Sequence, residues 1–320
     1  MAPAEAAPVR AEVESAAVVT AVEAAPVVPA AEVGAYARRR IEAIVEDALR
    51  EAGVLGVIPT PLEAIRRPAR VQALEPISAL PARVQALEPI SALPARVQAL
   101  EPISALPAPP GRRLLGALWF ERRVMYVDER QSPPRRRFTE AHELVHALCP
   151  WHEAVLRLDT ADELFKPVLD AVEAEANAGA GMLIFQGSAF ARRAAQGQCS
   201  IETAFALAHE HGASRHATLH HYVQTHPGRA AMLTVGRFPR RDGSLPVWRS
   251  VESPAFRRLH GRAAAHYPAG LRPGSALHGL AEASRTTGTG PRATVRLGER
   301  GRRFGAEAHY NRHAFLVLLS

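Results

Sequence analysis

Apolar residues recur at helical spacing soon after an irregular N-terminal stretch. Residues 1–33 are rich in Ala, Pro, Val and Glu without a helical or strand period, which predicts a disordered tail. From Ala35 to Ala52 apolar residues recur every three or four positions, and Gly53 follows, so we expect a helix there. The Pro59-Thr60-Pro61 sequence then predicts the start of a second, short helix with Thr60 as its cap.

Three identical copies of the sequence PARVQALEPISAL follow one another from Pro68 to Leu106. Complete identity is typical of a recent duplication in the coding sequence rather than of a solenoid. Each copy has prolines at its first and ninth positions, which forbid a continuous helix or a central strand. We expect one copy to supply an edge strand or a turn, and residues 67–107 to form a loop otherwise. A proline-rich docking segment is the functional alternative.

From Leu114 onward the pattern becomes that of strands and then of helices. Leu114–Phe120 and Val124–Val127 predict a β-hairpin. A helix is expected across Arg136–Leu148, followed by a long apolar helix across Leu164–Gly187. The expected elements of the second half are three helices and two strands: Ser200–His211, Ser214–Tyr222, Leu277–Ser284, Ala231–Phe238 and Phe315–Leu319.

Composition and charge narrow the classes of protein. Hydrophobic residues make up 47% of the 320 residues, which is enough to bury a core and excludes wholesale disorder. The net charge of +7 is uneven, because residues 227–320 carry 16 arginines against five acidic residues while residues 1–226 are mildly acidic. A basic C-terminal part is compatible with an acidic partner or direct nucleic-acid binding. A solvated arginine-rich face explains the same charge more simply.

The two cysteines, Cys149 and Cys199, form no disulfide framework and fit a reducing cytoplasm. Cys149 has no neighbours that mark a nucleophile, so we expect a buried thiol. Acidic residues interrupt the N-terminal stretch, so no signal peptide is predicted, and no apolar run reaches membrane-spanning length. The expected protein is cytoplasmic and has no membrane partner.

An HExxH sequence, His142-Glu143-Leu144-Val145-His146, lies in the helix expected at 136–148. Residues four apart share one face of a helix, so both imidazoles can reach one ion. Glu143 lies beside them and can act as general base toward a water that the ion activates. Five residues alone are a weak signal, and two surface histidines on an ordinary helix are the alternative.

A catalytic zinc site also needs a third protein ligand and an open position. Glu173 and Asn177 are four residues apart in the long helix, so we choose Glu173 as the third ligand and Asn177 as a hydrogen-bond partner for a ligand histidine. Glu175 is the competing ligand, although a solvated helix charge is the preferred interpretation of it. His152 could approach the site, but we favour a structural turn at that position.

Two motifs resemble those of one family. The sequence RFTEAHELVH, from Arg137 to His146, resembles the RFTxAHELGH signature of the ImmA/IrrE metallo-endopeptidases. The sequence EAEAN, from Glu173 to Asn177, with Met182-Leu183 after it, resembles the ExEAN…LLMP element of that family. The resemblance extends from about Ala35 to Gly187, apart from the repeats.

The resemblance implies a zincin-like fold, zinc as the ion with manganese as the alternative, and specific roles. His142, His146 and Glu173 would be the ligands and Glu143 the catalytic base. Val145 stands where the family has glycine, and Ile184-Phe185-Gln186 replaces its Met-Pro ending. Both departures concern packing rather than ligation.

The second half is similar to IrrE relatives in layout. Ala208, Gly212 and the helix after them have the spacing of a helix-turn-helix, and relatives of IrrE carry a GAF-like domain beyond such a segment. A helical packing unit without DNA contact is the preferred interpretation of residues 199–226. Five histidines there suggest a second metal site, but no acidic residue or cysteine completes a set, so none is expected: His209, His211, His216, His220 and His221.

The sequence therefore predicts an α+β protein with a disordered tail at 1–33 and a zincin-like metallopeptidase domain at 34–198. A helix-turn-helix-like segment at 199–226 and a basic, mixed α/β, GAF-like domain at 227–320 complete it. The predicted function is a zinc-dependent endopeptidase, and the resemblance implies that its substrate is a helix-turn-helix transcriptional repressor cut under stress. The alternative is a non-proteolytic, metal-containing regulator that binds DNA or senses a ligand.

Overall fold

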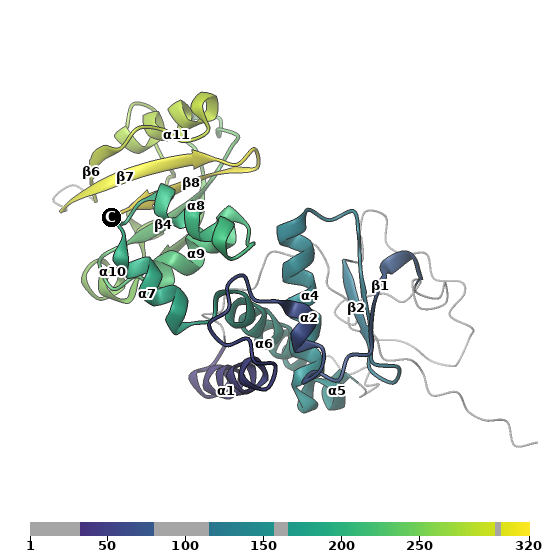
Figure 1. The fold of residues 1–320 in the computed structure, drawn as a ribbon. Coiled ribbons are helices and arrows are strands. Elements are labelled where there is room, and N and C mark those ends of the chain that lie inside the picture. Colours follow the sequence, from purple (N-terminus) through teal and green to yellow (C-terminus); the bar gives the residue numbers. More distant parts are fainter. Residues whose placement is uncertain (1–32, 80–114, 157–165, 298–301) are drawn as a thin grey trace, which may run out of the picture.

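The computed structural model describes residues 33–79, 115–156, 166–297 and 302–320 (Figure 1). Across these ranges the chain forms ten α-helices and two β-sheets, so the prediction of a mixed helix and sheet protein is confirmed. Residues 1–32 of the expected tail and the second and third repeat copies lie outside the described residues, whereas Val33 is buried in the core. No helix in the described ranges is both long and apolar enough to cross a bilayer.

Three helices form the core of the N-terminal half, and the sequence predicted each of them. Helix α6 packs against both of the others (Figure 1). The three are α1 (Ala35–Glu51), α4 (Pro133–Leu148) and α6 (Lys166–Phe185). Helix α1 buries Ile41, Val45, Ala48 and Leu49, whose three- and four-residue spacing puts them on one face. The apolar spacing therefore determines which side of α1 meets the core.

Helices α4 and α6 approach closely because α6 has a glycine at the contact. A Cβ atom on Gly179 would lie 2.7 Å from Cγ1 and 2.8 Å from Cγ2 of Val145. The side chain of Val145, which departs from the family's glycine, thus fills the space that Gly179 leaves. The contact also holds Glu173, six residues earlier on α6, near the histidines of α4.

The segment before the small sheet differs from its prediction. Helix α2 spans only Leu62–Ile65, and Pro61, not Thr60, occupies its N-cap position without a side-chain hydrogen bond. The Thr60 hydroxyl is buried and donates instead to the carbonyl oxygen of Leu183, 2.7 Å away at the end of α6. The expected cap is wrong because this long-range partner on α6 takes the hydroxyl.

The small sheet has the strand order β1-β3-β2 and carries the predicted hairpin. Strands β2 (Gly116–Trp119) and β3 (Val124–Val127) pair antiparallel. Strand β1 (Ala73–Pro76) comes from the first repeat copy and pairs parallel with β3 at the edge, as expected for one copy. The proline at position 76 is its last residue, where a missing N–H is tolerated, and a 3₁₀ turn (Ile77–Ala79) follows.

The C-terminal sheet is antiparallel, with the order β5-β4-β8-β7-β6, and helices cover both of its faces (Figure 1). Its strands are β4 (Ala231–Gly236), β5 (Val247–Glu252), β6 (Ala293–Arg296), β7 (Arg303–Tyr310) and β8 (Ala314–Leu319). Along β8, Leu316 and Leu318 join the apolar cluster of the N-terminal half, whereas Phe315 and Val317 join a second cluster on the other face. Burial on both faces explains the continuous apolar run.

Helices α8 and α9 face one side of this sheet and α11 packs on the other (Figure 1). The C-terminal helices are α7 (Ser188–Gln196), α8 (Ile201–Glu210), α9 (Arg215–Thr225), α10 (Pro254–His260) and α11 (Ala276–Thr287). The predicted pair α8 and α9 begins at Ser200 and Ser214, whose hydroxyls accept backbone N–H groups as caps. Helix α9 buries Leu219, Tyr222 and Val223, so one of its faces is used for packing.

Candidate metal centre

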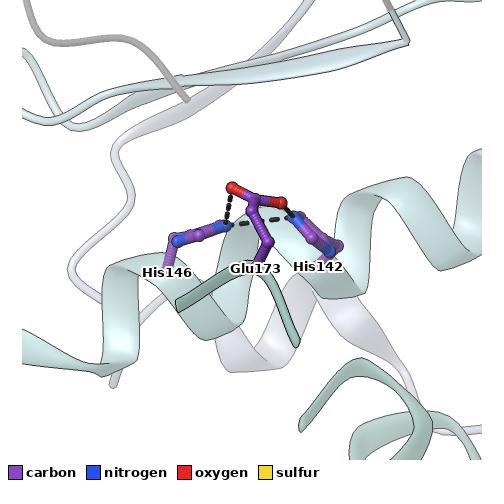
Figure 2. A group of neighbouring side chains, drawn as sticks. All are labelled: His142, His146 and Glu173. Atoms are coloured by element: carbon purple, nitrogen blue, oxygen red, sulfur yellow. Dashed lines mark hydrogen bonds and ion pairs between the residues drawn. The ribbon is translucent and has the colours of Figure 1, made fainter. Parts of the chain in front are cut away.

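The HExxH residues lie on the part of α4 that faces α6. His142 and His146 are one turn apart and buried, with side-chain exposures of 1% and 0%. Glu173 reaches them from α6, and its carboxylate lies across both imidazoles (Figure 2). Its side chain keeps 32% exposure, so solvent reaches the site from that side. In the described part of the chain, these three form the group of His, Cys, Asp and Glu side chains that could hold a metal ion.

The three donor atoms lie at similar separations. Nε2 of His142 is 3.0 Å from Nε2 of His146 and 3.3 Å from Oε2 of Glu173. Nε2 of His146 is 3.5 Å from Oε1 of Glu173. A tetrahedral zinc ion with bonds of about 2.0–2.1 Å keeps its ligand atoms roughly 3.3 Å apart. The residues present therefore fit a zinc ion without rearrangement of the backbone.

Hydrogen bonding fixes the tautomer of His142. Its Nδ1 lies 3.2 Å from the amide oxygen of Asn177, one turn beyond Glu173 on α6. An amide oxygen only accepts, so Nδ1 carries the hydrogen and the lone pair of Nε2 points toward Glu173. The same-face spacing that selected Asn177 from the sequence thus places it against this histidine.

The two histidines have opposite pKa shifts. Burial favours neutral His142, but hydrogen bonding and charge from Glu173 outweigh burial and raise its pKa. Burial, followed by the charges of His142 and His152, holds the pKa of His146 well below its ordinary value. A positive charge is therefore favoured between His142 and Glu173, where a cation would bind.

Glu143 is fully buried where α4 meets the first residue of β2. A Cβ atom on Gly116 would lie 3.0 Å from Oε1 of Glu143 and 2.3 Å from Cγ2 of Thr139. A larger residue at Gly116 would collide with both side chains. The glycine therefore lets the strand approach the helix beside the Glu143 carboxylate.

Two residues lie differently from their predicted positions. His152 is on helix α5 (Pro150–Leu156), not in a turn, and its Nδ1 is 3.1 Å from Nδ1 of His146. Glu175 is not a solvated charge, because its Oε2 accepts from Nε1 of Trp151 at 2.8 Å and lies 3.1 Å from Nε2 of His152. The signal in the sequence is Pro150, which separates α4 from α5, and α5 contacts both α4 and α6.

Cys149 is buried, as predicted, and burial raises the pKa of its thiol to about 12. Two histidines of the C-terminal cluster take part in packing: His221 stacks on Phe185 with ring centroids 4.4 Å apart, and Nδ1 of His211 lies 3.1 Å from the carbonyl oxygen of Ile184. Both side chains join α8 and α9 to the end of α6.

The comparison with protein-family models agrees with the motifs. Residues 103–222 match the model of a peptidase family described as the IrrE N-terminal-like domain. Among solved structures, the chain is similar to a Mycobacterium tuberculosis transcriptional regulator, with 16% identity over 88% of this chain and 75% of that chain and a TM-score of 0.48. No curated protein matches the chain. Residues 103–222 of this chain therefore carry a domain similar to the IrrE N-terminal-like peptidase domain.

Proposed function

We propose that this protein is a zinc-dependent endopeptidase of the HExxH type, with His142, His146 and Glu173 as ligands. The observation that carries the proposal is the set of three metal-donor atoms, 3.0–3.5 Å apart, beside the buried carboxylate of Glu143. Two imidazoles and one carboxylate suit zinc, with manganese as the alternative, and leave one position open as a catalytic site requires. Four closed ligands would instead favour a structural ion.

In this proposal each residue of the chain has a distinct role. A bound zinc ion supplies Lewis acidity, which makes a water nucleophilic at neutral pH and polarises the peptide carbonyl. Glu143, one residue after His142, takes the proton of the attacking water and returns it to the leaving amine. The strand residue Gly116 lets β2 approach the helix beside this carboxylate. Asn177 keeps His142 in the tautomer whose Nε2 is free to bind.

The proposed substrate is a helix-turn-helix transcriptional repressor in the cytoplasm, cut to release transcription under stress. This part rests on the resemblance to ImmA/IrrE proteins. In the proposed organisation, a tail at 1–33 and the peptidase domain at 34–198 precede a helical segment at 199–226. A basic, GAF-like domain at 227–320 would sense the inducing signal.

The rival proposal is a regulator that keeps the ion without turnover and binds DNA directly or senses a ligand. The net charge of +11 across residues 227–320 favours it. The Glu143 carboxylate beside the donor atoms favours the peptidase, because a structural site needs no general base.

The first test is Glu143→Gln, which keeps the shape of the side chain and removes its basicity. We expect normal zinc content and a loss of repressor cleavage of at least about 10²-fold, as for removal of a general base. Cleavage is measured by co-expression with a helix-turn-helix repressor encoded nearby. Undiminished regulatory activity in Glu143→Gln contradicts the peptidase, and zinc content unchanged in His142→Ala contradicts the ligand assignment.

A further inference from the structure

A chain of buried polar side chains continues from the side of His146 that faces away from Glu173. Nδ1 of His146 lies 3.1 Å from Nδ1 of His152, and Nε2 of His152 lies 3.1 Å from Oε2 of Glu175. His146 and His152 have no exposed surface, and 17% of the Glu175 side chain is exposed. These three side chains come from α4, α5 and α6 in turn, so three different helices have to pack correctly to bring them together.

The direction of each hydrogen bond follows from the Glu175 end. A carboxylate only accepts, so Nε2 of His152 carries the hydrogen that lies toward Oε2. In neutral His152 the other nitrogen, Nδ1, is then an acceptor, and the hydrogen between the two rings belongs to Nδ1 of His146. Nε2 of His146 is left with its lone pair directed at His142 and Glu173. This relay of His146, His152 and Glu175 therefore gives His146 the tautomer that binds an ion, as Asn177 does for His142.

The Glu175 end of the relay has two hydrogen-bond partners, because Oε2 faces both Nε2 of His152, at 3.1 Å, and Nε1 of Trp151, at 2.8 Å. The indole of Trp151 donates to the carboxylate oxygen that also faces His152. The guanidinium carbon of Arg40, on α1, lies 3.3 Å from the centroid of the Trp151 ring, so the guanidinium packs on one face of the indole.

We propose that His152 and Glu175 are positioning residues for the metal centre, which set the tautomer and orientation of His146 through a carboxylate–histidine–histidine relay. The inference rests on the proposed function, because it assumes that His146 binds the ion through Nε2. Neither residue contacts the reacting atoms. Partners of this kind typically contribute 10- to 100-fold to metal affinity by fixing the ligand ring and raising its basicity.

The test is the zinc dissociation constant of the full-length protein, measured by competition with a chromophoric chelator. Glu175→Gln keeps the shape of the side chain and removes its charge, and His152→Leu removes the relay altogether. Glu153→Gln is the matched control. Glu153, on α5, is a partly buried carboxylate like Glu175, but it pairs with Arg123, at 2.8 Å. We expect zinc affinity to fall about 10- to 100-fold in both relay variants and to change less than about twofold in the control.

The nitrogen-15 spectrum of the zinc-loaded wild-type protein supplies a second measurement that simple loss of packing does not reproduce. We expect His152 to be protonated at Nε2 and bare at Nδ1, and His146 to be protonated at Nδ1. The reverse tautomer of His152 overturns the relay, even if a variant such as His152→Leu fails to fold.

The outcomes separate the relay from the proposed function. Equal zinc affinity in wild type and His142→Ala overturns the metal site itself and the relay with it. Tight zinc binding that depends on His142 but stays within about twofold of wild type in Glu175→Gln and His152→Leu overturns only the relay.

Discussion

Gln186 ends helix α6 with a backbone φ of +48°, and its buried amide faces the segment between α1 and α2. Its side-chain oxygen accepts from the backbone N–H of Gly56. Its side-chain nitrogen donates toward the carbonyl oxygens of Val54 and Val57 and the hydroxyl oxygen of Thr60, at 2.9–3.2 Å. The amide thus attaches residues 54–60 to the end of the long helix.

Substitution of Gln186 separates these hydrogen bonds from the backbone conformation. Gln186→Ala leaves the buried groups of residues 54–60 unsatisfied, so we expect the free energy of unfolding to fall by about 3 kcal/mol. Gln186→Gly loses the same bonds but tolerates positive φ, and should be about 1 kcal/mol more stable than the alanine variant. Urea unfolding of the three proteins measures both differences. An alanine variant as stable as wild type contradicts the anchoring role.

Single residues of the site were predictable to the extent that they share a helix face. The i, i+4 spacing placed His142 beside His146 and Glu173 beside Asn177, and the structure brings all four together. His152 could not be located this way, because Pro150 changes the chain direction between it and the HExxH helix. Contact between His152 and Glu175 depends on how α5 packs on α6, and sequence spacing carries no information about that packing.

At the scale of elements, the pairing of α4 with α6 determines the geometry of the site, since each helix contributes only part of the donor set. At one close contact Val145 lies against Gly179, and a Cβ atom on Gly179 would also lie 3.0 Å from Cγ2 of Ile41 on α1. One methyl group too many at this contact would separate the helices, because packed cores tolerate added volume poorly.

A double-mutant cycle tests this complementarity. Gly179→Ala alone should destabilise the protein by about 1–3 kcal/mol through overpacking against Val145. In a Val145→Ala background the same change fills a vacated space and increases helix propensity. There Gly179→Ala should leave the free energy of unfolding unchanged or raise it by up to about 1 kcal/mol. Unfolding free energies of the four proteins give the coupling. Gly181→Ala, where a Cβ meets nothing within 4 Å, is the control. Additive effects at Gly179 and Val145 would rule out the contact.

Elements with a strong period of their own were predictable, and their long-range pairings were not. The apolar repeats of α1, α4 and α6, and the hairpin β2–β3, follow from local sequence. The parallel pairing of β1 with β3 does not, because about 47 residues separate the two strands and the ALEP sequence of β1 recurs in all three repeat copies, so local sequence does not select the copy that pairs. The sheet order of the C-terminal half is equally non-local: β8, the last strand, lies between β4 and β7.

At the scale of the whole molecule, helix α9 connects the two halves. Its buried face packs near β4 and β5, while His221 stacks on Phe185 of α6 and meets Phe190 of α7 edge to face. Nε2 of His221 is buried and has no hydrogen-bond partner within the described ranges. The junction between α6 and the C-terminal sheet therefore contains a neutral imidazole that cannot easily accept a proton.

This histidine makes the junction sensitive to acid. Burial, then the charges of His220, Arg38 and His211, lowers the pKa of His221 to about 3, and burial lowers that of His220 to about 4. Well above pH 6.5, His221 is neutral whether the chain is folded or unfolded, so its titration does not affect the free energy of unfolding there. As the pH falls below 6.5, His221 binds a proton in the unfolded chain but stays neutral in the folded chain. The free energy of unfolding therefore decreases by up to about 1.4 kcal/mol per pH unit.

His221→Phe keeps the ring against Phe185 and removes the titrating group. We expect stability at pH 7 to be unchanged or slightly higher, since an unsatisfied nitrogen disappears, and the loss of stability between pH 7 and pH 5 to shrink by about 2 kcal/mol. Urea unfolding at both pH values measures the change. His313→Gln, at an exposed histidine, is the control and should keep the wild-type pH dependence. If His221→Phe loses as much stability as wild type on acidification, His221 takes up its proton in the folded state and the junction is open to water.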